Sequence, residues 1–233
     1  MIIIFGSSKG VGKALANVFE DKKTLLISRQ KSTLKKNQIH LSLDINNFDY
    51  KTFDNQIINE EIEAIFFPVG LLKQNDDLNL NSEEINEIMN TNFLSIAKIT
   101  GHIIQSKSLS NSCSICFFSS VTTILPRDKN IIYCAAKNSL NSYYKSLDTY
   151  IKLNKLNIRL SLIILGFVNT TMNQNIKTFF PKMEAGKIAF YLKKNIKKLK
   201  GVYYIPYYWL LIKILISLTP NIMKLLISKM VNR

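Results

Sequence analysis

Short apolar runs alternate with amphipathic segments from the start of the chain, and this alternation predicts strands separated by helices. The runs predicted as strands are residues 2–5, 24–28, 39–43, 64–67, 114–119 and 158–165, with 201–206 as a further candidate. The segments predicted as helices are residues 10–20, 48–59, 82–106 and 130–153, and Asn81 or Ser82 is suited to cap the third of them. Short apolar strands connected by helices favour a parallel sheet with right-handed crossovers.

The predicted fold class is therefore α/β, a Rossmann-type, doubly wound parallel sheet with helices on both faces. A chain of 233 residues is long enough to bury one such core. We expect residues 1–206 to form one domain, because no repeat or linker divides them. Residues 207–233 are expected to extend this domain as a C-terminal apolar helical segment.

The C-terminal extension contains two apolar runs, and each is too short to cross a membrane. Residues 207–218 fall well below the length of about 20 residues that a membrane-spanning helix needs. Pro220 interrupts the pattern, and residues 222–231 are predicted to form a second short helix. Aromatic residues at the start and isolated lysines along both runs are typical of a hairpin in a membrane interface. The alternatives are that these helices cover a substrate cleft or form a dimer contact. The residues concerned are Tyr207, Tyr208, Trp209, Lys213, Lys224 and Lys229.

The net charge of +15 is concentrated toward the C-terminus. Residues 182–233 hold 11 of the 31 basic residues and a single acidic one, Glu184. A segment of this kind can meet nucleic acid or an anionic membrane surface, or serve solubility alone. No surface that combines aromatic and basic residues for reading bases is evident, so we expect no nucleic acid partner. The basic run at residues 193–200 is suited to anionic lipid.

The N-terminus and the cysteines bear on the compartment. The opening MIIIFG lacks the basic leader and the length of a signal peptide. Cys113 and Cys116 form a CxxC inside an apolar strand, where residues three apart face opposite ways, and Cys134 is a third thiol. We expect buried thiols in a reducing cytosol and no metal site. The protein is therefore expected to be cytoplasmic, and peripheral on the cytoplasmic face of the membrane.

A glycine-rich turn, GSSKGVG at residues 6–12, follows the first predicted strand. Glycines at such a point let the backbone approach a pyrophosphate at the N-terminus of the following helix. Lys9 in the turn and Arg29 after the second strand suit a 2′-phosphate, and no acidic residue stands at residues 28–29 to bind a ribose 2′-hydroxyl instead. The sequence therefore predicts NADPH rather than NADH. The turn residues expected to bind it are Gly6, Ser8, Lys9, Gly10, Val11 and Gly12.

The segment YCAAK places Tyr133 four residues before Lys137. On a helix this spacing projects both side chains from one face. A lysine charge close to a phenol stabilises tyrosinate, so we expect the pKa of Tyr133 to fall below its ordinary value of about 10. Such a phenol is a proton donor that works near neutral pH.

With these motifs, the chain resembles the short-chain dehydrogenase/reductase family over roughly residues 1–200. Ser120 lies thirteen residues before Tyr133, and Asn92 lies in MNTNFLS, as in the family's catalytic tetrad of Asn, Ser, Tyr and Lys. The resemblance implies that Tyr133 protonates a carbonyl oxygen that Ser120 orients, while Lys137 binds the nicotinamide ribose. It also implies that Asn92 holds a water that joins Lys137 to solvent. The further coenzyme-binding residues that it implies are Asp44, Ile45, Gly70, Val168 and Thr170, besides Tyr133 and Lys137.

Three positions depart from the family pattern. Phe5 replaces a threonine, residues 67–70 read Phe-Pro-Val-Gly instead of Asn-Asn-Ala-Gly, and Leu165 replaces a proline. These departures put the local sheet and loop geometry in doubt and leave the chemistry intact.

Residues 69–78 and the C-terminal segment are similar to those of the reductase half of the decaprenylphosphoryl-ribose 2′-epimerase system. The implied substrate is a 2-keto sugar on a polyprenyl phosphate, used in cell-envelope glycan synthesis and supplied by a flavoprotein oxidase. The alternatives are reduction of a lipid ketone of the 3-keto sphingoid or 3-oxoacyl type, and a dinucleotide-sensing protein without catalysis. A homo-oligomer is left open.

Overall fold

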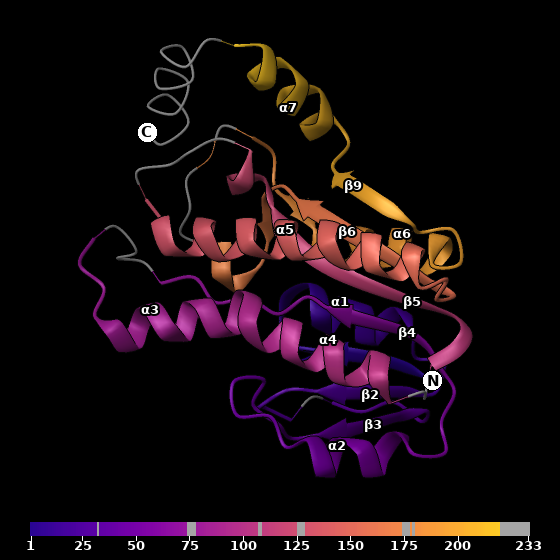
Figure 1. Ribbon diagram of the computed structural model, residues 1–233. Coiled ribbons are helices and arrows are strands. Elements are labelled where there is room, and N and C mark those ends of the chain that lie inside the picture. The colour runs from indigo at the N-terminus through magenta and orange to yellow at the C-terminus, as the bar shows by residue number, and fades with distance from the viewer. Residues whose placement is uncertain are drawn as a thin grey trace.

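A parallel sheet forms the centre of the molecule in the computed structural model, which describes residues 1–31, 33–73, 78–106, 109–124, 129–173, 178 and 180–219. Within these residues seven strands pair in the order β3-β2-β1-β4-β5-β6-β9, and every neighbouring pair is parallel. The strands are β1 (Ile2–Phe5), β2 (Thr24–Ile27), β3 (Gln38–Leu41), β4 (Ile62–Phe67), β5 (Leu109–Ser120), β6 (Ile158–Leu165) and β9 (Gly201–Ile205). The predicted Rossmann-type fold class is confirmed (Figure 1).

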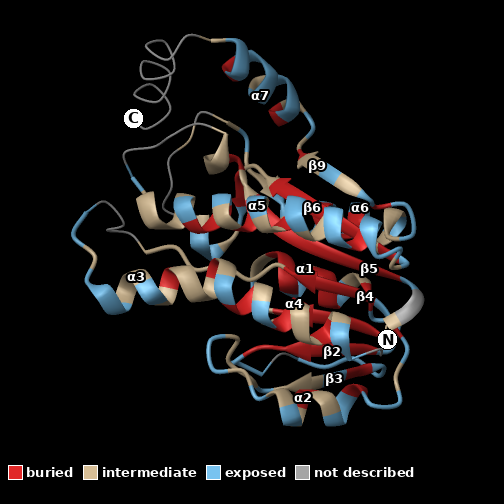
Figure 2. Ribbon diagram, viewed as in Figure 1, coloured by how far each residue is buried: buried red, intermediate tan, exposed pale blue. Residues whose placement is uncertain are grey.

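Helices cover both faces of this sheet because successive strand residues point to opposite sides. Ile3 and Phe5 join a core cluster with residues of α2, α4 and α5, whereas Ile2 and Ile4 join a second cluster with α1 and α6. Figure 2 shows the strands as the most continuously buried part of the molecule. The helices are α1 (Gly10–Val18), α2 (Tyr50–Ile57), α3 (Ser82–Met89), α4 (Ser95–Gln105), α5 (Ile131–Leu153), α6 (Ala185–Asn195) and α7 (Tyr208–Leu218).

The two cysteines of the CxxC lie on opposite faces of β5, as predicted. Cys113 belongs to the cluster under α2, α4 and α5, and Cys116 belongs to the cluster under α1 and α6. Burial raises the pKa of each thiol to about 12, so neither forms a thiolate readily at neutral pH. Both thiols therefore serve as core side chains.

An aromatic pair occupies two of the positions that depart from the family pattern. The rings of Phe5 on β1 and Phe67 on β4 stack with centroids 4.6 Å apart and planes 10° apart. Both side chains are fully buried, and Phe53 and Phe117 pack beside them. Stacking and burial of two large rings thus connect β1 with β4 at these positions.

The third departure lengthens a strand. Leu165 pairs with Ser120 on one side and with Ile205 on the other, so β6 continues to the level at which β5 ends. A proline would bring no N–H to this strand. Leu165, in place of the family's proline, therefore extends the sheet as far as Ser120.

Some local structure differs from the predicted elements. The helix predicted over residues 82–106 is interrupted by a π-helical turn at Asn90–Leu94. α6 and the short parallel pair β7 (Val168–Asn169) and β8 (Met183–Glu184) were not predicted, because their apolar residues are few and interspersed with lysines and polar residues. The second C-terminal helix, predicted for residues 222–231, lies outside the described residues.

Candidate active site

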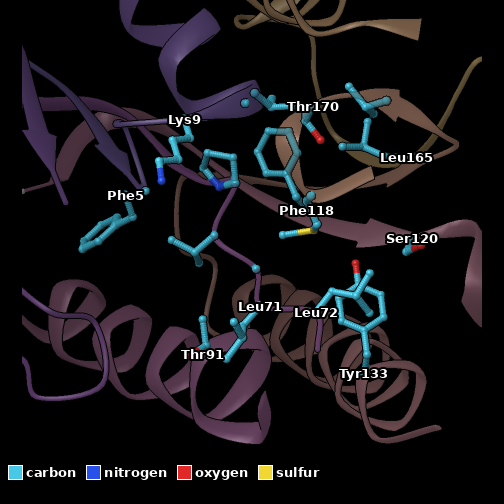
Figure 3. Close-up of a pocket in the computed structure, with 18 of the residues that line it drawn as sticks. Phe5, Lys9, Leu71, Leu72, Thr91, Phe118, Ser120, Tyr133, Leu165 and Thr170 are labelled. Atoms are coloured by element: carbon cyan, nitrogen blue, oxygen red, sulfur yellow. The ribbon is translucent and has the colours of Figure 1, made fainter. Parts of the chain in front are cut away.

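A cavity of about 460 Å³ opens at the carboxyl ends of the parallel strands. Its walls come from the turn after β1, the segments after β2, β3 and β4, the end of β5, the start of α5 and the segment after β6. In doubly wound folds this edge of the sheet is where ligands bind. Figure 3 shows Phe5 and Lys9 toward one end of the cavity and Ser120 and Tyr133 toward the other.

The glycine-rich turn brings the backbone of β1 against the start of α1. Gly6 has φ +69° and Gly10 has φ +53°, a region that favours glycine. A Cβ on Gly12 would lie 2.1 Å from the carbonyl oxygen of Gly6, so only glycine fits at this position. Gly6, Ser8, Lys9, Gly10 and Val11 line the cavity, whereas Gly12 closes the turn behind it. The turn and the start of α1 are suited to a pyrophosphate, because the first N–H groups of a helix have no partner within the helix and attract anions.

The segments after β2 and β3 form the wall near this turn. Arg29 and the predicted coenzyme-binding residues Asp44 and Ile45 all line the cavity. The Nη1 atom of Arg29 lies 3.7 Å from Oδ2 of Asp44, so an acidic group approaches the arginine from a distant point in the sequence. Sequence reasoning missed this pair because only the pairing of β2 with β3 brings the two residues together.

Hydrogen bonds around the hydroxyl of Ser28 stabilise the segment after β2 that forms part of this wall. The hydroxyl of the buried Ser7 donates to Oγ of Ser28 over 3.2 Å, and Ser28 Oγ lies 3.0 Å from Nε2 of His40. Ser28 also donates to the carbonyl of Gln30. The network fixes the direction in which the chain leaves β2, and thereby the position of Arg29.

Three of the four predicted tetrad residues meet at the other end of the cavity. Ser120 ends β5, and Tyr133 and Lys137 lie on one face of α5, and all three line the cavity. The hydroxyl of Ser120 forms a hydrogen bond with the phenol of Tyr133. The Lys137 ammonium lies 5.7 Å from the centroid of the Tyr133 ring, and it donates to the carbonyls of Phe118 (3.0 Å) and Val69 (3.3 Å).

The prediction that Lys137 lowers the pKa of Tyr133 is wrong. Burial raises the pKa of Tyr133 to about 12, and the hydrogen bond from Ser120 opposes this only in part. Burial also lowers the pKa of Lys137 to about 7. The reason is that both groups lose water, and loss of water disfavours the charged form of each. Tyr133 is therefore protonated at neutral pH, whereas Lys137 is partly deprotonated near pH 7.

Asn92 is placed differently from the other three residues. It is fully buried in the π-helical turn and is not part of the cavity lining. Its Nδ2 donates to the carbonyls of Leu71 (2.8 Å) and Ile88 (2.9 Å), and its Oδ1 accepts from the backbone N–H of Leu71 (3.1 Å). Asn92 thus holds the turn after β4, where a Cβ on Gly70 would lie 3.3 Å from its Oδ1 and 3.8 Å from the Lys137 ammonium. Its role in a water relay stays a prediction.

The segment after β6 completes the cavity. Val168 and Thr170, predicted to bind the coenzyme, line it. Thr170 packs against Gly10, with its Cγ2 3.2 Å from where a Cβ of that glycine would lie. Sequence reasoning missed several apolar lining residues, since an isolated leucine or phenylalanine in a loop carries no signal of its own. They are Leu71, Leu72, Val121, Phe167 and Met172.

Asn130 is a further lining residue that the sequence did not single out. It immediately precedes α5, three residues before Tyr133, with φ +59°, and its side chain makes no capping hydrogen bond. Asparagine adopts this left-handed conformation more readily than most residues do. Its amide is therefore a polar group at the cavity that the helix itself does not use.

Comparison with protein-family models matches residues 1–179 to the family described as short chain dehydrogenase. The chain belongs to this family. The resemblance expected from the tetrad is thus confirmed at the level of the family, whose members are oxidoreductases that use NAD or NADP.

The relatives of this short-chain dehydrogenase agree with that assignment. It is 24% identical over 193 residues to the 3-oxoacyl-[acyl-carrier-protein] reductase FabG of Buchnera aphidicola, covering 75% of this chain and 76% of that protein. A short chain dehydrogenase family protein from Francisella tularensis has the same fold, with a TM-score of 0.76, 21% identity and coverage of 88% of this chain and 96% of that one. A Burkholderia cenocepacia short chain dehydrogenase, solved in complex with NADP, has a TM-score of 0.75, 15% identity and coverage of 87% and 86%.

Proposed function

We propose that the protein is an NADPH-dependent reductase of a ketone carried on an apolar chain. The observation that carries this proposal is the hydrogen-bonded pair of Ser120 and Tyr133, which shares one cavity with the glycine-rich turn. The two hydroxyls are suited to hold a carbonyl oxygen, and the apolar lining residues are suited to the chain attached to the ketone. NADPH, when bound, supplies the hydride that reduces the carbonyl carbon.

The protein's own residues then handle the proton. Tyr133 gives its phenolic proton to the carbonyl oxygen as the C=O bond becomes an alcohol, and Ser120 holds that oxygen in place. The tyrosinate formed lies near Lys137, whose pKa of about 7 allows it to take up and give back protons at neutral pH. The balanced change is one ketone, one NADPH and one proton converted to one alcohol and NADP.

Two substrate classes are proposed, in order. The first is a 2-keto sugar on a polyprenyl phosphate, formed by a flavoprotein oxidase and used for the cell envelope. The similarity of residues 69–78 and of the C-terminal segment supports this class. The second is a lipid ketone of the 3-oxoacyl or 3-keto sphingoid type. The 24% identity to a 3-oxoacyl reductase supports that class.

A direct comparison of the ketone classes tests the proposal. Purified protein with NADPH is given a polyprenyl-phosphate keto sugar and an acyl thioester with a 3-oxo group, and the loss of NADPH absorbance is followed. We expect turnover of the keto sugar lipid with kcat/KM at least about tenfold above that of the thioester. The reverse ratio would make the lipid ketone the substrate, and turnover of neither would contradict the proposed function.

Preference for NADPH is proposed to depend on Arg29. Its side chain is 68% exposed and its guanidinium faces Asp44, so a 2′-phosphate can replace the carboxylate as its partner. We expect Arg29→Leu to raise the KM for NADPH about tenfold or more, and to change the KM for NADH much less. Steady-state kinetics with both coenzymes measures this ratio. Lys36→Leu removes an exposed charge from the β2–β3 connection outside the cavity lining and is the matched control. If Arg29→Leu left the ratio of the two KM values unchanged, residues other than Arg29 would determine the coenzyme preference.

A further inference from the structure

α7 presents an apolar face to solvent, opposite the face that packs on the domain. Trp209 and Ile216 are buried on the inner side. Successive residues of a helix are about 100° apart, which gathers the exposed apolar residues on the outer side. These residues, 43–78% exposed, are Tyr207, Leu210, Leu211, Ile214, Leu215 and Leu218. They are called the α7 face below, and Figure 2 shows the largely exposed surface of this helix.

The inner side of α7 is attached to the wall of the cavity. The Trp209 indole packs against Gly166, where a Cβ would lie 2.3 Å from Nε1, and its ring lies 4.6 Å from Phe180 and 6.2 Å from Phe167 between centroids. Gly166 and Phe167 belong to the segment after β6 that lines the cavity. The α7 face is therefore held in a defined orientation relative to the active site.

The charged residues of the C-terminal segment, taken from the sequence, all have one sign. Residues 207–233 contain four basic residues and no acidic one. Lys213 is exposed on α7, on the side nearer β9, where its ammonium is 5.6 Å from the centroid of the Tyr204 ring. The basic run at residues 193–200 precedes β9 and α7 follows it, so the two lie at opposite ends of that strand (Figure 1). Lys193 is also already paired with Asp21 at 2.5 Å.

We propose that the α7 face docks onto an anionic lipid surface, and that it does so without the basic run at residues 193–200. Aliphatic residues flanked by cations and an interfacial tyrosine are the composition of a helix that lies in a headgroup layer. A second copy of the chain would bring like charges together, which disfavours a dimer through this face. Docking would place the attached cavity wall close to the lipid.

Vesicle flotation with the full chain tests the docking. We expect binding to vesicles of phosphatidylcholine with phosphatidylglycerol, and at least about tenfold weaker binding to phosphatidylcholine alone. The double variant Leu211→Glu/Leu215→Glu is expected to lose about a hundredfold in affinity for the anionic vesicles. Its control is Ile58→Glu/Leu153→Glu, which adds the same charge at two residues that are 72% and 78% exposed at the ends of α2 and α5. Equal loss in both double variants, or no binding of the wild type, would overturn the proposal.

A second measurement locates the contact. Trp209 is the only tryptophan in the sequence, and it is buried. The fluorescence that a second, introduced tryptophan adds therefore shows whether lipid contacts the position of that residue. We expect lipids with brominated acyl chains to quench the added fluorescence of Leu215→Trp and to leave that of Leu153→Trp unchanged. Equal quenching of the two would overturn the assignment to α7. Analytical sedimentation gives a further contrary outcome. If the wild type were a dimer and Leu211→Glu/Leu215→Glu a monomer, the α7 face would bind a second copy of the chain, and the lipid assignment would be overturned.

The docking surface does not depend on the proposed reaction, because neither measurement needs turnover. Failure of vesicle binding with intact ketone reduction would remove the surface and keep the enzyme. Vesicle binding without any turnover would keep the docking surface and contradict the proposed reaction.

Discussion

Tyr133→Phe is expected to lower kcat for ketone reduction by about a thousandfold or more, and to leave NADPH binding within about twofold. The phenol is the only proton donor proposed for the carbonyl oxygen, and general acid catalysis typically contributes a factor of about 100 to 10,000. The variant keeps the ring against which Lys137 packs and removes only the oxygen. Single-turnover absorbance measures the chemical step, and the fluorescence of bound NADPH measures affinity.

Tyr150→Phe is the matched control for this change. It removes the same atom from the same helix, at a side chain that is 53% exposed and lies outside the cavity lining. We expect it to retain the activity of the wild type. If Tyr133→Phe were as active as this control, the chain would be a dinucleotide-binding protein without the proposed chemistry, or another group would donate the proton.

Lys137→Met is expected to abolish turnover and at the same time to stabilise the fold at neutral pH. Lys137 is 3% exposed, and burial lowers its pKa from 10.5 to about 7. Between these values the unfolded chain binds a proton that the native state does not, so stability rises with pH over this window. The lysine therefore costs the most stability below about pH 7, and this cost disappears toward about pH 10.5.

Replacing the lysine removes that cost, with a partial offset from the lost hydrogen bonds to Phe118 and Val69. We expect Lys137→Met to gain about 3 kcal/mol at pH 7 and little at pH 10, measured by urea unfolding at a series of pH values. Lys145→Met, at an exposed lysine of the same helix, is expected to change the free energy of unfolding by less than about 0.5 kcal/mol. If the gain in the free energy of unfolding of Lys137→Met instead increased with pH, Lys137 would be charged and stabilising in the native state.

Together the two variants distinguish the proposed roles. Tyr133→Phe removes a proton that the native state holds up to about pH 12, so it acts on chemistry alone at neutral pH. Lys137→Met acts on both chemistry and stability, because its target is a buried base. A catalytic group that destabilises its own fold is expected where the pKa must lie near the working pH.

The amino-acid sequence was sufficient for features that depend on local spacing. Apolar strands between amphipathic helices required a parallel sheet, and the four-residue separation of Tyr133 from Lys137 required that both project from one face of α5. The same reasoning placed Cys113 and Cys116 on opposite faces of β5. Glycines at residues 6 and 10 indicated a turn that other residues strain to form. Each of these features follows from the period of a helix or strand and needs no knowledge of distant contacts.

Other features depend on residues that are far apart in sequence, and only the tertiary structure decided them. Burial reversed the predicted pKa shift of Tyr133, because the free energy of removing water from a phenolate exceeds the attraction of a lysine that is itself buried. The pairing of β2 with β3 brought Asp44 to Arg29, and the π-helical turn directed Asn92 toward Leu71. Solvation and long-range packing are properties of the assembled fold, and a linear pattern of residues contains no measure of either.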